Sequence, residues 1–191
     1  MKVFGGTNAI LSRWTEEYPG IDKHIDEVLG FEGVYRGWGV TEVNMGPSNM
    51  DEPRILKETD DIIWRRSGDG TVEQVYKKGD YNRHACEWPI RTIEDWKAYR
   101  DKHLDPDDPL RFPTDWISRI EEYRNRDYPL QLTHRGVYGF VRERMGDLNL
   151  AYAFYDAPDL IHEMMEYYTD MAIRLWEKQL EDVEFDLIEC R

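Results

Sequence analysis

The strongest constraint on the fold is a long helical pattern near the end of the chain. After Asp156-Ala-Pro-Asp, apolar side chains recur at spacings of three and four as far as about Asp182. Pro158 suits the first helical position, and Asp156 or Ala157 is the expected cap. The apolar face comprises Ile161, Met164, Met165, Tyr168, Met171, Ala172, Leu175 and Trp176. We predict one long amphipathic helix whose methionines belong to the core and whose acidic side chains face water.

Extended segments lie on both sides of this helix. Residues 183–190 carry apolar Phe185, Leu187 and Ile188 and are typical of a strand. Residues 128–136 form a second short strand that ends in glycine, and a helical pattern then runs from Phe140 to Phe154. The order strand, helix, helix, strand predicts an α/β fold.

Shorter patterns complete the expected secondary structure. Residues 92–100 and 114–123 each begin with a threonine able to cap a helix, and the segment 105–113 between them is rich in Pro and Asp, as in a loop. Residues 62–66 and 71–76 flank Asp69-Gly70, which is expected to supply the positive-φ positions of a hairpin turn. Residues 21–30 predict a short helix closed by Gly30. Five of the seven tryptophans, Trp38, Trp64, Trp88, Trp96 and Trp116, are expected to be core or covering residues.

Composition excludes several classes of protein. The chain has 191 residues and a net charge of −14, which argues against nucleic acid or a membrane surface as the main partner. It contains no apolar run of about 18 residues and no signal-peptide pattern, so we expect a soluble cytoplasmic protein. Cys86 and Cys190 are too few for a disulfide framework and are expected to be reduced.

His84 and Cys86 have a spacing that can chelate zinc, with Glu87 alongside as an oxygen ligand. A protein zinc site needs at least three ligands, and no second His and Cys pair follows. We therefore expect no metal and no other cofactor.

The strongest candidate for a ligand site is the segment 134–144, where a strand ends and a helix begins. Ligands of α/β folds bind at this edge of the sheet, where His134 and Arg135 would be presented. Arg142 and Arg144 would then be placed to pair with substrate carboxylates. The alternative is structural: His134 caps or fills a barrel end, and Arg142 and Arg144 bridge to the acidic helix.

The chain also resembles a known family, the uroporphyrinogen decarboxylase superfamily of (β/α)₈ barrels, in its decarboxylase-like bacterial branch. The similar segments are residues 53–61, 65–71, 88–96, 136–148 and 155–165, of which the last two are the most specific. The resemblance spans roughly residues 31–190 and implies the N-terminal half of such a barrel. It implies one partial domain over residues 1–191, with a β-hairpin insertion at about 60–78.

The resemblance implies a carbon-carbon lyase that removes CO₂ from acetate side chains of a tetrapyrrole, in porphyrin biosynthesis. Arg135 and Arg142 would hold substrate carboxylates, and His134 and Tyr138 would donate protons to the developing carbanion. The alternatives are a corrinoid-dependent methyltransferase of the same superfamily, acting on a corrinoid-linked substrate, and a non-catalytic assembly module.

The sequence departs from the family in two respects. It lacks the Arg-rich opening motif of authentic decarboxylases, and it lacks the later strands of the barrel, which typically needs about 250 residues. We expect a truncated chain in which the open sheet is closed by a second copy, as a homo-oligomer, or by a complementary chain.

Overall fold

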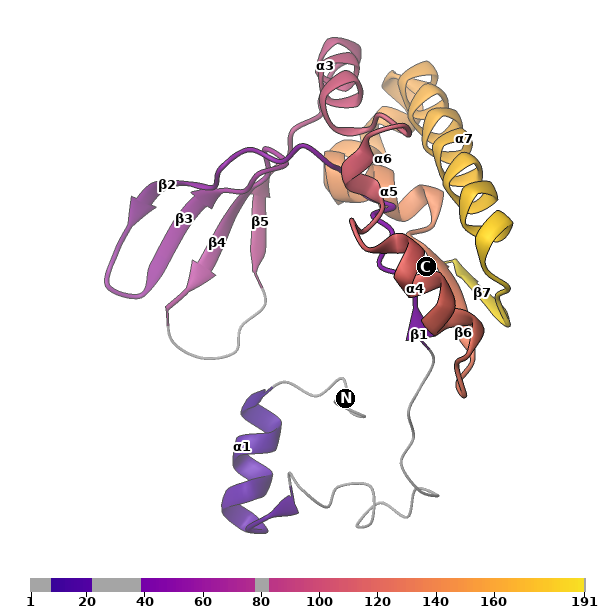
Figure 1. Ribbon diagram of the computed structural model, residues 1–191. Coiled ribbons are helices and arrows are strands. Elements are labelled where there is room, and N and C mark those ends of the chain that lie inside the picture. Colours follow the sequence, from indigo (N-terminus) through magenta and orange to yellow (C-terminus); the bar gives the residue numbers. More distant parts are fainter. Residues whose placement is uncertain (1–7, 22–38, 78–82, 191) are drawn as a thin grey trace.

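The computed structural model describes residues 8–21, 39–77 and 83–190 (Figure 1). Its first element is helix α1, Asn8–Glu17, which the sequence patterns did not predict. Most of the helix predicted at residues 21–30 lies outside the described residues, as does Trp38.

Three parallel strands form the central sheet. They are β1 (Gly39–Val40), β6 (Leu130–His134) and β7 (Leu187–Cys190), in the order β1-β6-β7. Strands β1 and β7 both pair with β6 in parallel. In this register Gly39 lies opposite Leu130, and Leu187 lies opposite Gln131. A second sheet and two helices separate β1 from β6 in sequence, and three helices connect β6 to β7; the sequence order of the three strands is also their spatial order.

A second sheet is antiparallel and lies to one side of the helical body (Figure 1). It comprises β2 (Arg54–Glu58), β3 (Ile62–Arg66), β4 (Val72–Tyr76) and β5 (His84–Glu87), in that order. The predicted hairpin is confirmed as β3 and β4, and it belongs to a larger sheet of four strands. Within its turn, Gly70 has a φ of +89°, whereas Asp69 does not have positive φ. Asp69 instead accepts hydrogen bonds from the Ser67 hydroxyl and the Thr71 amide.

Two helices precede β6. In α3, Ile93–His103, Thr92 caps the helix as predicted: its hydroxyl accepts from the Asp95 amide, and the Asp95 carboxylate accepts from the Thr92 amide. In α4, Trp116–Arg124, the cap position is Asp115, so the prediction that Thr114 opens this helix is wrong. The loop between them contains one 3₁₀ turn, η1, Pro109–Arg111.

The buried Arg111 fixes this loop against the segment that follows β1. Its guanidinium donates to the carbonyl oxygens of Asp105, Asn44 and Gly46, at 2.5, 2.8 and 2.9 Å. The side chain is completely buried. These charge-assisted bonds to backbone carbonyls join two segments that are far apart in sequence.

Three helices connect β6 to β7. The single helical pattern expected from Phe140 to Phe154 is divided into α5 (Val137–Met145) and α6 (Asp147–Asp156), because Gly146 between them has φ +77° and ψ 156°. The long helix α7, Pro158–Asp182, begins and ends as predicted, with Ala157 at its cap. The strand after it begins at Leu187, later than the predicted residue 183.

The helices and the central sheet enclose two clusters of buried apolar residues. The larger includes Met164, Met171 and Trp96, and the smaller includes Trp116. Met164, Met171 and these two tryptophans are core residues, as predicted, and Met165 is partly buried against the larger cluster. The fold class is mixed α/β, and of the helices that the structure describes, none combines the length and apolar composition of a membrane span.

Candidate functional site

The predicted ligand site lies where β6 ends and α5 begins. His134 is the last residue of β6, and Arg135 and Gly136 connect it to Val137, the first residue of α5. Gly136 occupies the cap position, so no side chain caps the helix. Carboxyl ends of parallel strands are where ligands of α/β proteins usually bind, so this edge is the candidate site.

His134 is buried at this edge and does not face solvent. Only 7% of the residue is exposed. Its ring stacks on Tyr168 of α7, with centroids 5.3 Å apart, and lies edge-on to Trp176 at 5.1 Å. Burial lowers the pKa of His134, because removal from water penalises the imidazolium. His134 therefore packs between β6 and α7.

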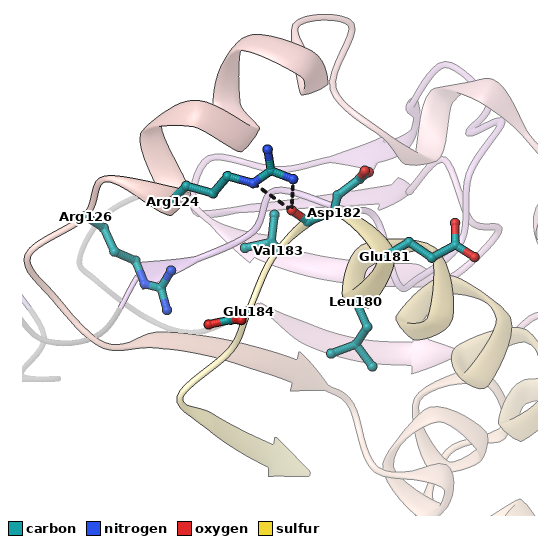
Figure 2. Close-up of a pocket in the computed structure, with 7 residues that line it drawn as sticks. All are labelled: Arg124, Arg126, Leu180, Glu181, Asp182, Val183 and Glu184. Carbon is teal, nitrogen blue, oxygen red and sulfur yellow. Dashed lines mark hydrogen bonds between the residues drawn. The ribbon is translucent and has the colours of Figure 1, made fainter.

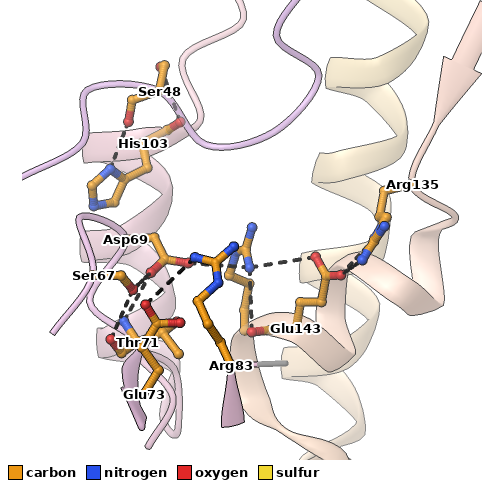
Figure 3. A network of polar contacts seen from close by, with 10 residues as sticks. Ser48, Ser67, Asp69, Thr71, Glu73, Arg83, His103, Arg135 and Glu143 are labelled. Atoms are coloured by element: carbon orange, nitrogen blue, oxygen red, sulfur yellow. Dashed lines mark hydrogen bonds and ion pairs between the residues drawn. The ribbon is translucent and has the colours of Figure 1, made fainter. Parts of the chain in front are cut away.

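Arg135 is half-exposed and pairs with Glu143, the single acidic residue of α5. Its Nε donates to Glu143 Oε1 at 2.7 Å, and Nη2 donates to the same oxygen. A substrate carboxylate that bound Arg135 would therefore compete with Glu143. Figure 3 shows this pair at one end of a longer polar network.

Tyr138 and Arg142 lie on α5 and reach solvent. Tyr138 is 53% exposed, and the nearest carboxylate to Arg142 is Asp147, with Nε 3.9 Å from Oδ1. No hydrogen bond, ion pair or ring contact joins any two of the side chains of His134, Arg135, Tyr138 and Arg142 within the described part of the chain. The structure therefore places His134 and Arg135 at the carboxyl end of β6, and Tyr138 and Arg142 on α5, without bringing the four side chains into contact.

Arg144 occupies a position that the sequence did not predict. Its guanidinium lies 3.5 Å from Asp69 Oδ2 in the turn of the antiparallel sheet, and both side chains are largely buried. It also lies over the rings of Phe140 and Tyr99, at 5.5 and 5.9 Å. The expectation that Arg142 and Arg144 bridge to the acidic helix α7 is thus wrong, because their ionic partners lie elsewhere.

The Asp69 carboxylate is ionised in this cluster. Burial opposes its ionisation, but hydrogen bonds from Ser67 and Thr71 and the nearby charge of Arg144 outweigh that effect and lower its pKa. In Figure 3, Asp69 and Thr71 face the same network as Glu143 and Arg135. The cluster ties the turn of the antiparallel sheet to the C-terminal end of α5.

A surface hollow of about 390 Å³ lies at the opposite edge of the central sheet (Figure 2). Its lining includes Arg124, which donates to the Asp182 carbonyl oxygen at 2.9 and 3.2 Å. Arg126 also lines it and pairs with Asp186 at 2.7 Å. These residues were not predicted as a site. The hollow lies next to the amino ends of β6 and β7, where residues of parallel α/β folds usually serve stability.

Within the described part of the chain, the His84 and Cys86 pattern of β5 has no third ligand. His84 is exposed, and the nearest polar contact of Cys86 is the His84 carbonyl oxygen, 3.5 Å from Sγ. No group of three His, Cys, Asp or Glu side chains suited to a metal ion occurs among residues 8–21, 39–77 and 83–190.

Comparison with protein-family models, with curated proteins and with solved structures finds no match for this chain. Its function must therefore be argued from its residues and their geometry.

Proposed function

We propose that β1, β6 and β7 are consecutive strands of a (β/α)₈ barrel of the uroporphyrinogen decarboxylase type. The observation that carries this proposal is the strand order: three parallel strands are neighbours in the order of the sequence, and helices directly precede β6 and β7. A barrel adds each new strand beside the preceding one. A doubly wound sheet has the same order within each half and reverses it only at a switch point, so the resemblance of residues 136–148 and 155–165 is what favours the barrel over it.

In such a barrel the ligand would bind beyond the carboxyl ends of these strands. The proposed activity is loss of CO₂ from acetate side chains of a tetrapyrrole. Arg142 and Arg135 would hold carboxylates, the latter after exchange from Glu143. Tyr138 carries the more accessible proton donor, since it is 53% exposed and His134 is 7% exposed. His134 would then act by positioning α7 against β6.

Three observations favour the non-catalytic assembly module as a second candidate. The four predicted site residues do not converge, and the charge of Arg135 is already paired. Within the described residues, β1 and β7 each pair with β6 alone, which leaves one edge of each strand open. Such edges bind further strands. A second copy or a complementary chain would close the sheet and complete the site.

Incubation of the purified chain with uroporphyrinogen, followed by chromatography of the oxidised porphyrins, tests the decarboxylase. We expect products with fewer carboxylates, and at least about tenfold slower turnover in Arg142→Ala, as expected for loss of a charge-assisted contact. Arg124→Ala at the opposite edge is the matched control and should keep full turnover. Equal turnover in both variants would reject the proposed site.

Absence of turnover in the wild-type chain would reject the decarboxylase and leave the module. Light scattering then tests closure of the sheet: a stable oligomer supports it, and a monomer at every concentration counts against closure by a second copy. Zinc retained by the purified protein, together with methyl transfer from a corrinoid, would favour the methyltransferase.

A further inference from the structure

Helix α6 is apolar on two opposite sides. Leu150 and Ala153 are buried and hold the helix against the core. Leu148, Tyr152 and Tyr155 are 68%, 62% and 89% exposed. On a helix that turns about 100° per residue, these three lie within about 60° of one another, on the side away from the buried pair. We call Leu148, Tyr152 and Tyr155 the outer stripe.

An outer stripe of this kind is unusual for a helix at a protein surface. A surface helix normally carries polar residues on its outer side, and a helix that is apolar all round is normally covered on all sides. Large, rigid tyrosine side chains are also enriched at protein interfaces. The outer stripe therefore has the composition of a face that another molecule covers.

The charges around the outer stripe indicate which kind of molecule would cover it. Asp147 and Asp156 lie on opposite sides of the stripe, both exposed, and Asp159 follows in the first turn of α7. The nearest cation to Asp147 is Arg142, at 3.9 Å, and the Asp147 side chain is 86% exposed. The apolar stripe thus has an acidic margin, which complements a partner with basic flanks.

We propose that the outer stripe of α6 binds a basic amphipathic helix of another protein, with apolar residues on the stripe and Lys or Arg beside Asp147 and Asp156. A second copy of this chain fits poorly. Antiparallel pairing of two α6 helices would place Asp147 of one copy near Asp156 of the other, in molecules that each carry a net charge of −14. An anionic lipid surface is repelled for the same reason. This inference is independent of the barrel and of its activity.

The test uses the full-length chain and two synthetic peptides of 16 residues. Both carry leucine at helical spacings i, i+3, i+4 and i+7, one with lysine and the other with glutamate at the flanking positions. Calorimetric titration should detect binding of the lysine peptide, and the glutamate peptide should bind at least about tenfold more weakly. Added salt should weaken binding of the lysine peptide, because exposed charges are screened.

Variants locate the binding face. Tyr152→Ser and Tyr155→Ser should each weaken binding of the lysine peptide by about tenfold or more, as substitutions of central aromatic residues do in interfaces. Asp147→Asn with Asp156→Asn should reduce the preference for lysine over glutamate. Ile117→Ser removes a side chain that is 77% exposed on α4 and serves as the matched control, with unchanged affinity.

Four results would overturn the proposal. They are failure of the lysine peptide to bind, equal binding of both peptides, equal effects of Tyr152→Ser and Ile117→Ser, and an oligomer of the chain that Tyr152→Ser dissociates. The last result would assign the outer stripe to a second copy. Circular dichroism of each variant checks that loss of binding does not reflect loss of fold.

Discussion

Gly146→Ala should strongly destabilise the protein, because two separate effects act at this residue. Gly146 has φ +77° and ψ 156°, a region that is nearly restricted to glycine and costs other residues about 1–3 kcal/mol. A Cβ atom there would also lie 2.6 Å from ring atoms of Trp88. Displacement of a packed side chain typically costs about 1–3 kcal/mol more. We expect a total loss of about 2–6 kcal/mol.

Urea unfolding followed by circular dichroism at 222 nm measures this loss. A loss of about 3 kcal/mol corresponds to a decrease in Tm of about 6–12 °C for a chain of this size. Gly46→Ala is the matched control: its new Cβ would meet only Asn44 Oδ1, at 3.5 Å, an ordinary contact. In a Trp88→Ala background the steric part should vanish, so that the effect of Gly146→Ala falls to about 1–3 kcal/mol. A loss within about 0.5 kcal/mol of that in Gly46→Ala would refute the reasoning.

Three further predictions concern stability. Arg111→Met should cost about 3–5 kcal/mol in urea unfolding, because it leaves several buried carbonyl groups without a donor; a cost under about 1 kcal/mol would show that the carbonyls find other partners. Thr92→Ala should cost about 1 kcal/mol through loss of the capping box, whereas Thr114→Ala should cost almost nothing, and the reverse ranking would contradict the observed helix starts. The pKa of His134 is lowered in the folded state, so below about pH 6.5 the unfolded state binds more protons than the folded state. The free energy of unfolding should therefore fall as the pH is lowered below about 6.5, by up to about 1.4 kcal/mol per pH unit. His134→Phe should flatten this dependence, and an unchanged slope would exclude His134 as its source.

The elements that sequence patterns predicted are those with local signals. Pro158 and the apolar spacing of α7 lie within the helix itself, and Thr92 forms its capping box with a residue three positions away. Gly70, which has positive φ, likewise lies within the turn between β3 and β4 that it predicts. These contacts are close in sequence, so residue order alone carries the information.

The missed elements depend on distant partners or on one backbone conformation. Every residue of β2 is exposed, and its sequence shows no alternation of apolar and polar residues that would predict a strand. The extended conformation of β2 is fixed by pairing with β3. The division of α5 from α6 rests on Gly146 alone. A glycine within a helical pattern is tolerated often enough that it did not indicate a break.

The end of β6 was located by sequence, but the orientation of the side chains beside it was not. His134 was correctly placed at the end of a strand, yet contacts with Tyr168 and Trp176, more than thirty residues later, turn its ring into the core. Arg144 was assigned to the wrong partner because Asp69 approaches it only through the docking of the antiparallel sheet. A pattern indicates which residues lie at an edge, whereas tertiary packing decides which way they face.

The central claim is that β1, β6 and β7 are parallel neighbours in the order of the sequence. NMR scalar couplings across backbone hydrogen bonds report this order directly. The amide of Gly39 should couple to the carbonyl of Pro129, and that of Asp186 to the carbonyl of Leu130, since both bonds are 2.9 Å long. Observation of both couplings would place β6 between β1 and β7. Coupling of the Asp186 amide to a residue of β1 instead would contradict the strand order and the barrel proposed from it.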